Sequence, residues 1–298
     1  MNQVVLHPTP RAGVIVREQF RAVGVGLRRE ILAAIAVIIA ITVLVLVAVF
    51  RGSTNESVTL SPDGAGFVLG LIGLLTPLAV WKSETPSNRG YFWSLPVPRG
   101  RHALIKVFSG WAWLMIGIST LLGWIALQVF FTGGTPGVDE MRYVFADAAT
   151  PAIMHATVDP AALRQVHWTT PSWQWVVPFI APTIAYLIGS AATLISDHPW
   201  RLLAAPLIVF GLLGALAEAG NFNWLANFSY QILAGPYSTE TLFTGSNEAA
   251  TYVNLTTGKS VHVWRNLAQA QQWFTTALIW FVPAFTAMAF AARRYQER

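Results

Sequence analysis

The segment Ile31–Phe50 is a continuous apolar run that contains no charged residue. A helix rises about 1.5 Å per residue and the hydrocarbon core of a bilayer is roughly 30 Å thick, so about 20 such residues cross a membrane. Soluble domains disperse their apolar residues with helix or strand periodicity instead. Composition agrees, because only 11% of the 298 residues are charged, against about a quarter in a soluble domain. The sequence therefore predicts an integral membrane protein.

Five further apolar runs follow the first. The second is short and glycine-rich and contains Pro77, which neighbouring helices tolerate in a membrane. The third exceeds one bilayer crossing, so we expect its first turns, with Lys106, to protrude into the cytoplasm. The predicted spans are about 31–50, 66–82, 103–131, 173–196, 201–217 and 273–292. We therefore expect an all-α fold with six transmembrane helices in a single membrane domain covering residues 1–298.

The distribution of lysine and arginine predicts the orientation, because these residues accumulate in cytoplasmic loops. With the N-terminus inside, all but five of the 19 basic residues fall on the inner side. The five outside are Arg51, Arg142, Arg164, Lys259 and Arg265. We expect both termini in the cytoplasm and the protein in the plasma (inner) membrane of a bacterium. The two long outer segments, 132–172 and about 218–272, are expected to form a small external cap.

The stretch before the first span alternates apolar residues with arginines such as Arg17, Arg21 and Arg28. An amphipathic segment of this kind suits a helix at the membrane surface, where arginines meet anionic headgroups. The other interpretation is a cytoplasmic tail that carries ordinary positive-inside charge. The amphipathic pattern favours the first, so we expect an elbow helix over residues 12–29.

The inner connection between spans two and three is rich in aromatic and apolar residues placed among charged ones. It runs from Glu84 to Arg101 and includes Tyr91, Trp93 and Leu95. Aromatic anchors with an arginine rim are typical of a surface that docks a soluble partner. The same residues equally suit the inner membrane interface, with the arginines as topology determinants. The residues alone do not decide between these two interpretations.

A motif in this connection resembles one in the permease subunits of type-2 ABC exporters. It consists of Glu84, Gly90, Leu95-Pro96-Val97, Arg99 and Lys106. The resemblance extends to six spans, an amphipathic elbow helix and cytoplasmic termini. It implies a coupling helix within residues 84–101 that sits in a groove of a cytoplasmic ATPase, with a second contact at the 196–200 turn. The implied coupling residues are Glu84, Gly90, Tyr91, Trp93, Leu95, Pro96, Arg99, Arg101, Asp197 and His198.

The resemblance also implies the partners. Two permease subunits, identical or related, would assemble with two ABC ATPase subunits that bind ATP and Mg²⁺, while this chain binds no cofactor or metal and is not an enzyme. The spacing of His155, His167 and His262 matches no metal-ligand motif. Nothing in the sequence suggests nucleic acid as a partner. A different function is a membrane subunit that transmits force, or anchors external proteins, without moving a substrate.

Overall fold

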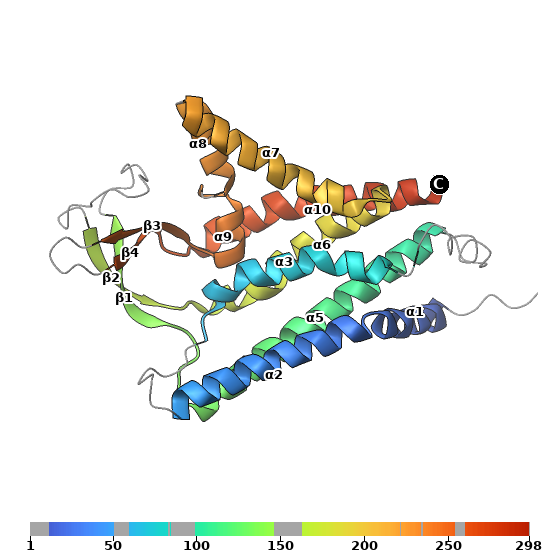
Figure 1. The fold of residues 1–298 in the computed structure, drawn as a ribbon, viewed down its shortest axis with the longest axis horizontal. Coiled ribbons are helices and arrows are strands. Elements are labelled where there is room, and N and C mark those ends of the chain that lie inside the picture. Colours follow the sequence, from blue (N-terminus) through green and yellow to red (C-terminus); the bar gives the residue numbers. More distant parts are fainter. Residues whose placement is uncertain are drawn as a thin grey trace, which may run out of the picture.

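The computed structural model describes residues 12–50, 60–82, 84, 99–145, 163–220, 222–233, 235–253 and 260–297. Long helices form a bundle that carries a small sheet at one end (Figure 1). The helices are α1 (Ala12–Gly26), α2 (Arg28–Phe50), α3 (Pro62–Trp81), α5 (Arg99–Phe131), α6 (Val177–Ile195), α7 (Pro199–Gly220), α8 (Asn223–Leu233), α9 (Thr239–Thr244) and α10 (Ala270–Glu297). A 3-10 turn, η2 (Ser172–Val176), precedes α6. The strands are β1 (Asp139–Phe145), β2 (Leu163–Thr169), β3 (Asn247–Val253) and β4 (Ser260–Asn266).

Each of the six predicted spans coincides with a long helix, namely α2, α3, α5, α6 with η2, α7 and α10. Within the described residues, four helical segments are long and apolar enough to cross a membrane by length and composition. They are Arg99–Phe131, Ser172–Ile195, Pro199–Ala217 and Ala270–Tyr295. The apolar part of α3, Gly66–Trp81, is shorter. The protein therefore has the helices of a membrane protein, while the number of six spans stays a prediction.

The bundle core is formed by α3, α5, α6 and α10, and α3 packs most closely on α6. Gly73 and Gly189 lie where the two backbones meet. A Cβ at Gly73 would collide with the Pro182 carbonyl, and one at Gly189 would collide with the Leu74 carbonyl. Small residues of this kind let membrane helices approach and gain van der Waals contact. The Tyr186 hydroxyl extends the core by donating a 2.7 Å hydrogen bond from α6 to the Val107 carbonyl of α5.

The elbow helix predicted at residues 12–29 is present as α1, and the chain enters α2 directly after Leu27. α1 is seated on α5. The Phe20 ring stacks on Trp113 with 5.0 Å between centroids, and Trp113 Nε1 donates a 3.0 Å hydrogen bond to the Phe20 carbonyl. Val23 and Leu27 are buried together with Val80 of α3. The helix is thus confirmed, and its position at a membrane surface stays a prediction.

The expectation of an all-α fold is wrong in one respect, because the two segments predicted to lie outside form a four-stranded sheet with the order β2-β1-β4-β3. Each segment contributes an antiparallel hairpin, β1 with β2 and β3 with β4. The hairpins join through the parallel pair β1–β4, in which Tyr143 faces Val263. These seven-residue strands are rich in Val, Tyr, Trp and Phe, which suit a pleated surface. The sequence pattern of a seven-residue strand is a much weaker signal than an apolar run of about 20 residues, so the strands were not predicted.

Arg142 holds the centre of this sheet. It is 5% exposed, and its Nε donates a 2.7 Å hydrogen bond to Glu140 Oε1. Its guanidinium lies 4.3 Å from the Trp264 ring centroid and 5.3 Å from that of Trp168. These rings come from β4 and β2, on either side of β1. Cation–π attraction to both therefore offsets part of the cost of burying the charge.

The two ends of the bundle differ in character. Figure 1 shows α1, the C-terminus and the turn between α6 and α7 toward one end, and the sheet with α9 toward the other. The first end also holds the end of α3 and the start of α5. Elements predicted to face the cytoplasm therefore share one end, and the sheet formed by the predicted outer segments lies at the opposite one.

Candidate functional site

Glu84 is the first residue of the predicted coupling segment, and it lies just beyond the end of α3. Its backbone N–H donates a 3.0 Å hydrogen bond to the Trp81 carbonyl, which extends the last turn of the helix. The side chain is only 4% exposed. A buried carboxylate is stable only when it is paired and hydrogen-bonded. Its partners come from two other helices, α5 and α10.

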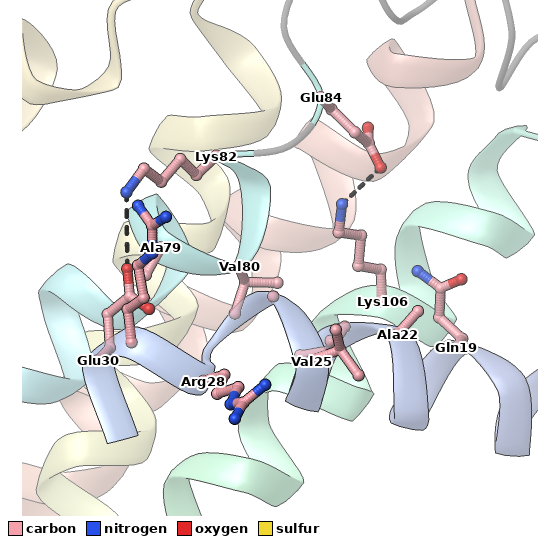
Figure 2. A pocket seen from close by; sticks show the side chains of 13 residues that line it. Gln19, Ala22, Val25, Arg28, Glu30, Ala79, Val80, Lys82, Glu84 and Lys106 are labelled. Atoms are coloured by element: carbon pink, nitrogen blue, oxygen red, sulfur yellow. Dashed lines mark hydrogen bonds and ion pairs between the residues drawn. The ribbon is translucent and has the colours of Figure 1, made fainter. Parts of the chain in front are cut away.

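Three side chains bind the Glu84 carboxylate. Lys106 Nζ lies 2.6 Å from Oε1, in the contact drawn in Figure 2, and His102 Nε2 lies 3.3 Å from the same oxygen. The Tyr295 hydroxyl, in the last turns of α10, donates a 2.9 Å hydrogen bond to Oε2. We call Glu84, His102, Lys106 and Tyr295 the Glu84 cluster. It joins the ends of α3, α5 and α10 through one carboxylate.

The Glu84 carboxyl is strongly acidic in this environment. Burial by itself raises its pKa, but the hydrogen bond from His102, the charge and hydrogen bond of Lys106, and the hydrogen bond from Tyr295 together lower the pKa from 4.5 to about 2. The ionised form is favoured because every partner stabilises it. Glu84 is therefore a carboxylate at neutral pH, and its Oε1 lies 2.6 Å from Lys106 Nζ.

Trp81 forms an aromatic wall beside the cluster. Lys106 Nζ lies 4.6 Å from the centroid of its ring, and the Tyr295 ring meets it edge-on with 5.6 Å between centroids. The ring keeps water from one side of the ion pair and adds cation–π attraction. The Glu84 cluster is therefore a compact, desolvated contact, in which the Coulomb interaction is stronger than at an open surface.

The Glu84 cluster is a structural connection, because one carboxylate binds residues of two helices. The residue at the start of segment 85–98 is fixed to α5 by an ion pair and to α10 by a hydrogen bond. A carboxylate with a pKa near 2 is a poor general base at neutral pH. The arrangement is suited to transmit displacement between helices.

The other predicted coupling residues fall into three groups. Gly90, Tyr91, Trp93, Leu95 and Pro96 lie outside the described residues. Arg99 begins α5 and is half-buried, while Arg101 is exposed on the same turn.

The third group is the second predicted contact, in the turn between α6 and α7. Asp197 and His198 are exposed there, and the His198 N–H donates a 3.1 Å hydrogen bond to Ser196 Oγ. Arg101, Asp197 and His198 are thus accessible, whereas the Glu84 carboxylate faces its own chain.

Sequence reasoning missed two members of the cluster and gave a third no structural role. His102 and Lys106 are four residues apart and share one face of α5, a spacing that brings side chains together on a helix. That spacing, just after a stretch containing a glutamate, was the available signal. Tyr295 gave no comparable signal, because its contact with Glu84 spans 211 positions.

Comparisons with protein-family models, with curated proteins and with solved structures found no match to this chain. Among the described residues, no group of three or more histidines, aspartates and glutamates is arranged to hold a metal ion. His167 instead pairs with Asp139 on the exposed face of the sheet, with 2.7 Å between Nε2 and Oδ1. The long apolar helices and the Glu84 cluster are therefore the features of the described residues that bear on function.

Proposed function

We propose that this chain is the membrane-spanning permease subunit of an ATP-driven ABC exporter. A separate cytoplasmic ATPase hydrolyses ATP, and this chain converts the motion of the ATPase into movement of helices. The Glu84 cluster is the observation that carries the proposal. It fixes the start of the predicted coupling segment to both α5 and α10 at a single carboxylate.

The mechanism follows from that connection. A force applied to residues 85–98 pulls on Glu84 at one end and on α5, which begins at Arg99, at the other. The ion pair between Glu84 and Lys106 joins these two ends, so the segment and α5 move as one body. Tyr295 passes the same displacement to α10. Closure of two ATPase subunits would thus rearrange the helices of two permease subunits around a shared path.

The turn with Asp197 and His198 gives a second point of contact at the same end of the bundle (Figure 1). It is short, exposed and directly joined to α6, which packs on α3 and α10. Two separate contacts would let an ATPase rotate the permease rather than merely bind it. ATP and Mg²⁺ belong to the ATPase in this proposal, and this chain supplies no catalytic group.

The sheet supports a second candidate function, a membrane subunit that transmits force or anchors external partners without moving a substrate. It is built from both long outer segments and ends in the edge strands β2 and β3. Edge strands can pair with a partner chain. Both functions share the ATPase contact and differ in whether a substrate crosses the membrane.

The experiment that tests the proposal is purification of the tagged full chain from native membranes in mild detergent, with its partners identified by mass spectrometry. We expect a P-loop ATPase in equal amount. Arg101→Ala should reduce the recovered ATPase severalfold, because its exposed guanidinium lies where the ATPase docks. The matched control Arg17→Ala removes an exposed arginine from α1 and should leave recovery unchanged. Reproducible absence of any ATPase would overturn the proposal.

A further inference from the structure

A cationic cavity of about 390 Å³ lies where α1 meets α2, beside the end of α3 and the start of α5. We call it the elbow pocket. Its charged lining residues are Arg28, Arg29, Glu30, Lys82, Glu84 and Lys106. Figure 2 shows Glu30 from α2 and Lys82 from the end of α3 reaching toward each other on one side, and Lys106 reaching toward Glu84 on the other. Four basic side chains against two carboxylates leave an excess of two positive charges.

The excess charge resides on two arginines. Lys106 is paired with Glu84, with 2.6 Å between Nζ and Oε1. Lys82 lies 3.8 Å from Glu30, and both of these side chains are substantially exposed, so their attraction is weak. Arg28 and Arg29 are exposed and form no ion pair with any residue that the structure describes. Two guanidiniums that line one cavity without counterions favour an anion there, and the fork geometry of each suits a phosphate.

A second cavity, of about 430 Å³, adjoins the elbow pocket. The two share Glu30 and Ala79 as lining residues. Beyond them the second cavity is almost wholly apolar, and we call it the apolar groove. It runs between α2, α3 and α5 and is lined by Leu27, Ile31, Ala34, Ile38, Leu69, Ile72, Leu75, Thr76, Trp113, Leu114, Gly117, Ile118 and Leu121. A charged pocket therefore borders a hydrophobic one.

The groove exists because α2 is held to α5 at two separated places. Near its start it follows α1, whose Phe20 and Val23 pack around Trp113 and Val80. Further along, Thr42 accepts hydrogen bonds from Trp124 Nε1 at 3.0 Å and from Gln128 Nε2 at 2.7 Å. The space between these two places is not filled by side chains, which leaves apolar surface of three helices around it.

The depth of the groove corresponds to one leaflet of a bilayer. From Glu30 to Ile38 the helix rises about 12 Å at about 1.5 Å per residue. Half of a hydrocarbon core of roughly 30 Å is about 15 Å. The charged end lies beside the elbow helix, at the level where headgroups would meet α1, and the apolar end lies toward the middle of α2. The charge of the elbow pocket and the apolar lining and length of the groove therefore match the headgroup and acyl chain of one lipid oriented along the membrane normal.

We propose that the elbow pocket and the apolar groove together bind one anionic phospholipid of the leaflet that contacts α1. Its phosphate lies against Arg28 and Arg29, and an acyl chain fills the groove between α2, α3 and α5. This inference goes beyond the permease function. It requires that the helices stand in a membrane, but it holds whether or not an ATPase binds the chain.

The headgroup half of the proposal is tested by native mass spectrometry of the full chain in detergent. The probes are phosphatidylglycerol and phosphatidylcholine with identical acyl chains. We expect phosphatidylglycerol to bind at least roughly tenfold more tightly, and Arg28→Gln with Arg29→Gln to remove that preference, because each arginine near the headgroup favours anionic lipid. The control pair Arg17→Gln with Arg21→Gln removes the same charge from α1 outside the pocket and should preserve the preference.

The acyl half is tested at Gly117, which lines the groove and has open space where a Cβ would stand. Gly117→Leu, whose Cβ has room there, should occupy the groove and reduce retention of both lipids severalfold. Gly123→Leu is the matched control, since Gly123 also has open space on α5 but does not line the groove. Unchanged thermal unfolding of both variants, followed by tryptophan fluorescence, would show that they fold.

Several outcomes would overturn the proposal. Equal binding of the two lipids, or equal losses in the pocket and control arginine pairs, would mean general attraction to the basic elbow. Displacement of phosphatidylglycerol by millimolar inorganic phosphate would assign the pocket to a free anion. If Gly117→Leu changed the number of chains in the particle instead of the bound lipid, a second copy of the chain would be the occupant.

Discussion

The hydroxyl of Tyr295 donates a 2.9 Å hydrogen bond to Oε2 of Glu84, which stands 211 positions earlier in the chain. The bond joins the last helix to the residue that follows α3, and Lys106 joins the same carboxylate to α5. Three helices, of which α10 is distant in sequence from the other two, thus meet at one side chain. Removing that side chain should therefore destabilise the packing of α3, α5 and α10 at this end of the bundle.

The first prediction concerns the ion pair between Glu84 and Lys106. Glu84→Gln leaves a buried ammonium without its counterion and should lower the free energy of unfolding by about 3 kcal/mol. Lys106→Met should cost a similar amount. The double variant should cost less than the sum by about 1–3 kcal/mol, because the two groups interact directly. Equilibrium unfolding in sodium dodecyl sulfate, followed by tryptophan fluorescence, measures each value.

The control for this cycle is the pair Glu30 and Lys82, which lie 3.8 Å apart with side chains 39% and 70% exposed. Solvent screens such a pair, so its coupling energy should be below about 1 kcal/mol. Additive effects of Glu84→Gln and Lys106→Met would contradict the assignment of a desolvated ion pair to the cluster.

The second prediction concerns pH. The pKa of Glu84 is about 2 in the folded protein and 4.5 without its surroundings. A lowered carboxyl pKa stabilises the folded state above pH 4.5, and this contribution is lost as the pH falls from about 4.5 to 2. The loss should amount to about 3 kcal/mol, at 1.36 kcal/mol for each pKa unit. The measurement is the difference in stability between wild type and Glu84→Gln across this range, which should shrink as the solution is acidified. A difference that is constant with pH would mean that Glu84 is not held ionised by its partners.

The helices were predictable from the sequence because an uncharged run such as Ile31–Phe50 leaves few alternatives to a helix in a bilayer. The elbow helix was equally predictable from its amphipathic pattern. The sheet was not, because β1 and β4 are each seven residues long and pair across more than a hundred positions. A single strand of that length carries too little periodicity to reveal a distant partner.

The candidate site was predictable in part. The resemblance pointed to Glu84 and to Arg101, which does lie exposed at the start of α5. It also suggested that Glu84 faces a partner, whereas the structure buries the carboxylate against Lys106 and Tyr295. Which way a side chain turns depends on the helices packed around it. That packing, unlike helix location, is set by contacts between residues far apart in the chain.

The third prediction tests the orientation of the helices. The chain contains no cysteine, so a single introduced thiol can be labelled without background. In right-side-out membrane vesicles, a maleimide that cannot cross the bilayer should label Arg164→Cys on the exposed face of β2. His198→Cys, in the turn between α6 and α7, should be labelled only after the vesicles are opened. The reverse pattern would invert the proposed topology, and labelling of both in sealed vesicles would exclude it.

The fourth prediction concerns the close approach of α3 and α6. A side chain at Gly189 would collide with the Leu74 carbonyl, so Gly189→Leu must push the helices apart and should cost about 1–3 kcal/mol or more. Gly211→Leu on α7, where a Cβ meets open space, should not lower stability by more than about 0.5 kcal/mol. The yield of monodisperse protein in detergent and its midpoint of thermal unfolding report the difference. Equal behaviour of the two variants would mean that the glycine contact does not determine this packing.

The parallel pairing of β1 with β4 has a consequence for biosynthesis. Residues 139–145 leave the ribosome long before residues 260–266, because two long helices, α6 and α7, and the shorter elements β2, α8, α9 and β3 are made in between. Until β4 is made, one edge of β1 has no partner strand, and an unpaired strand edge can pair with another chain and aggregate. The two hairpins can therefore join into one sheet only when synthesis of the chain is nearly complete. A chain interrupted after α7 would contain the helices up to α7 but would lack β3, β4 and α10, so the four-stranded sheet could not form.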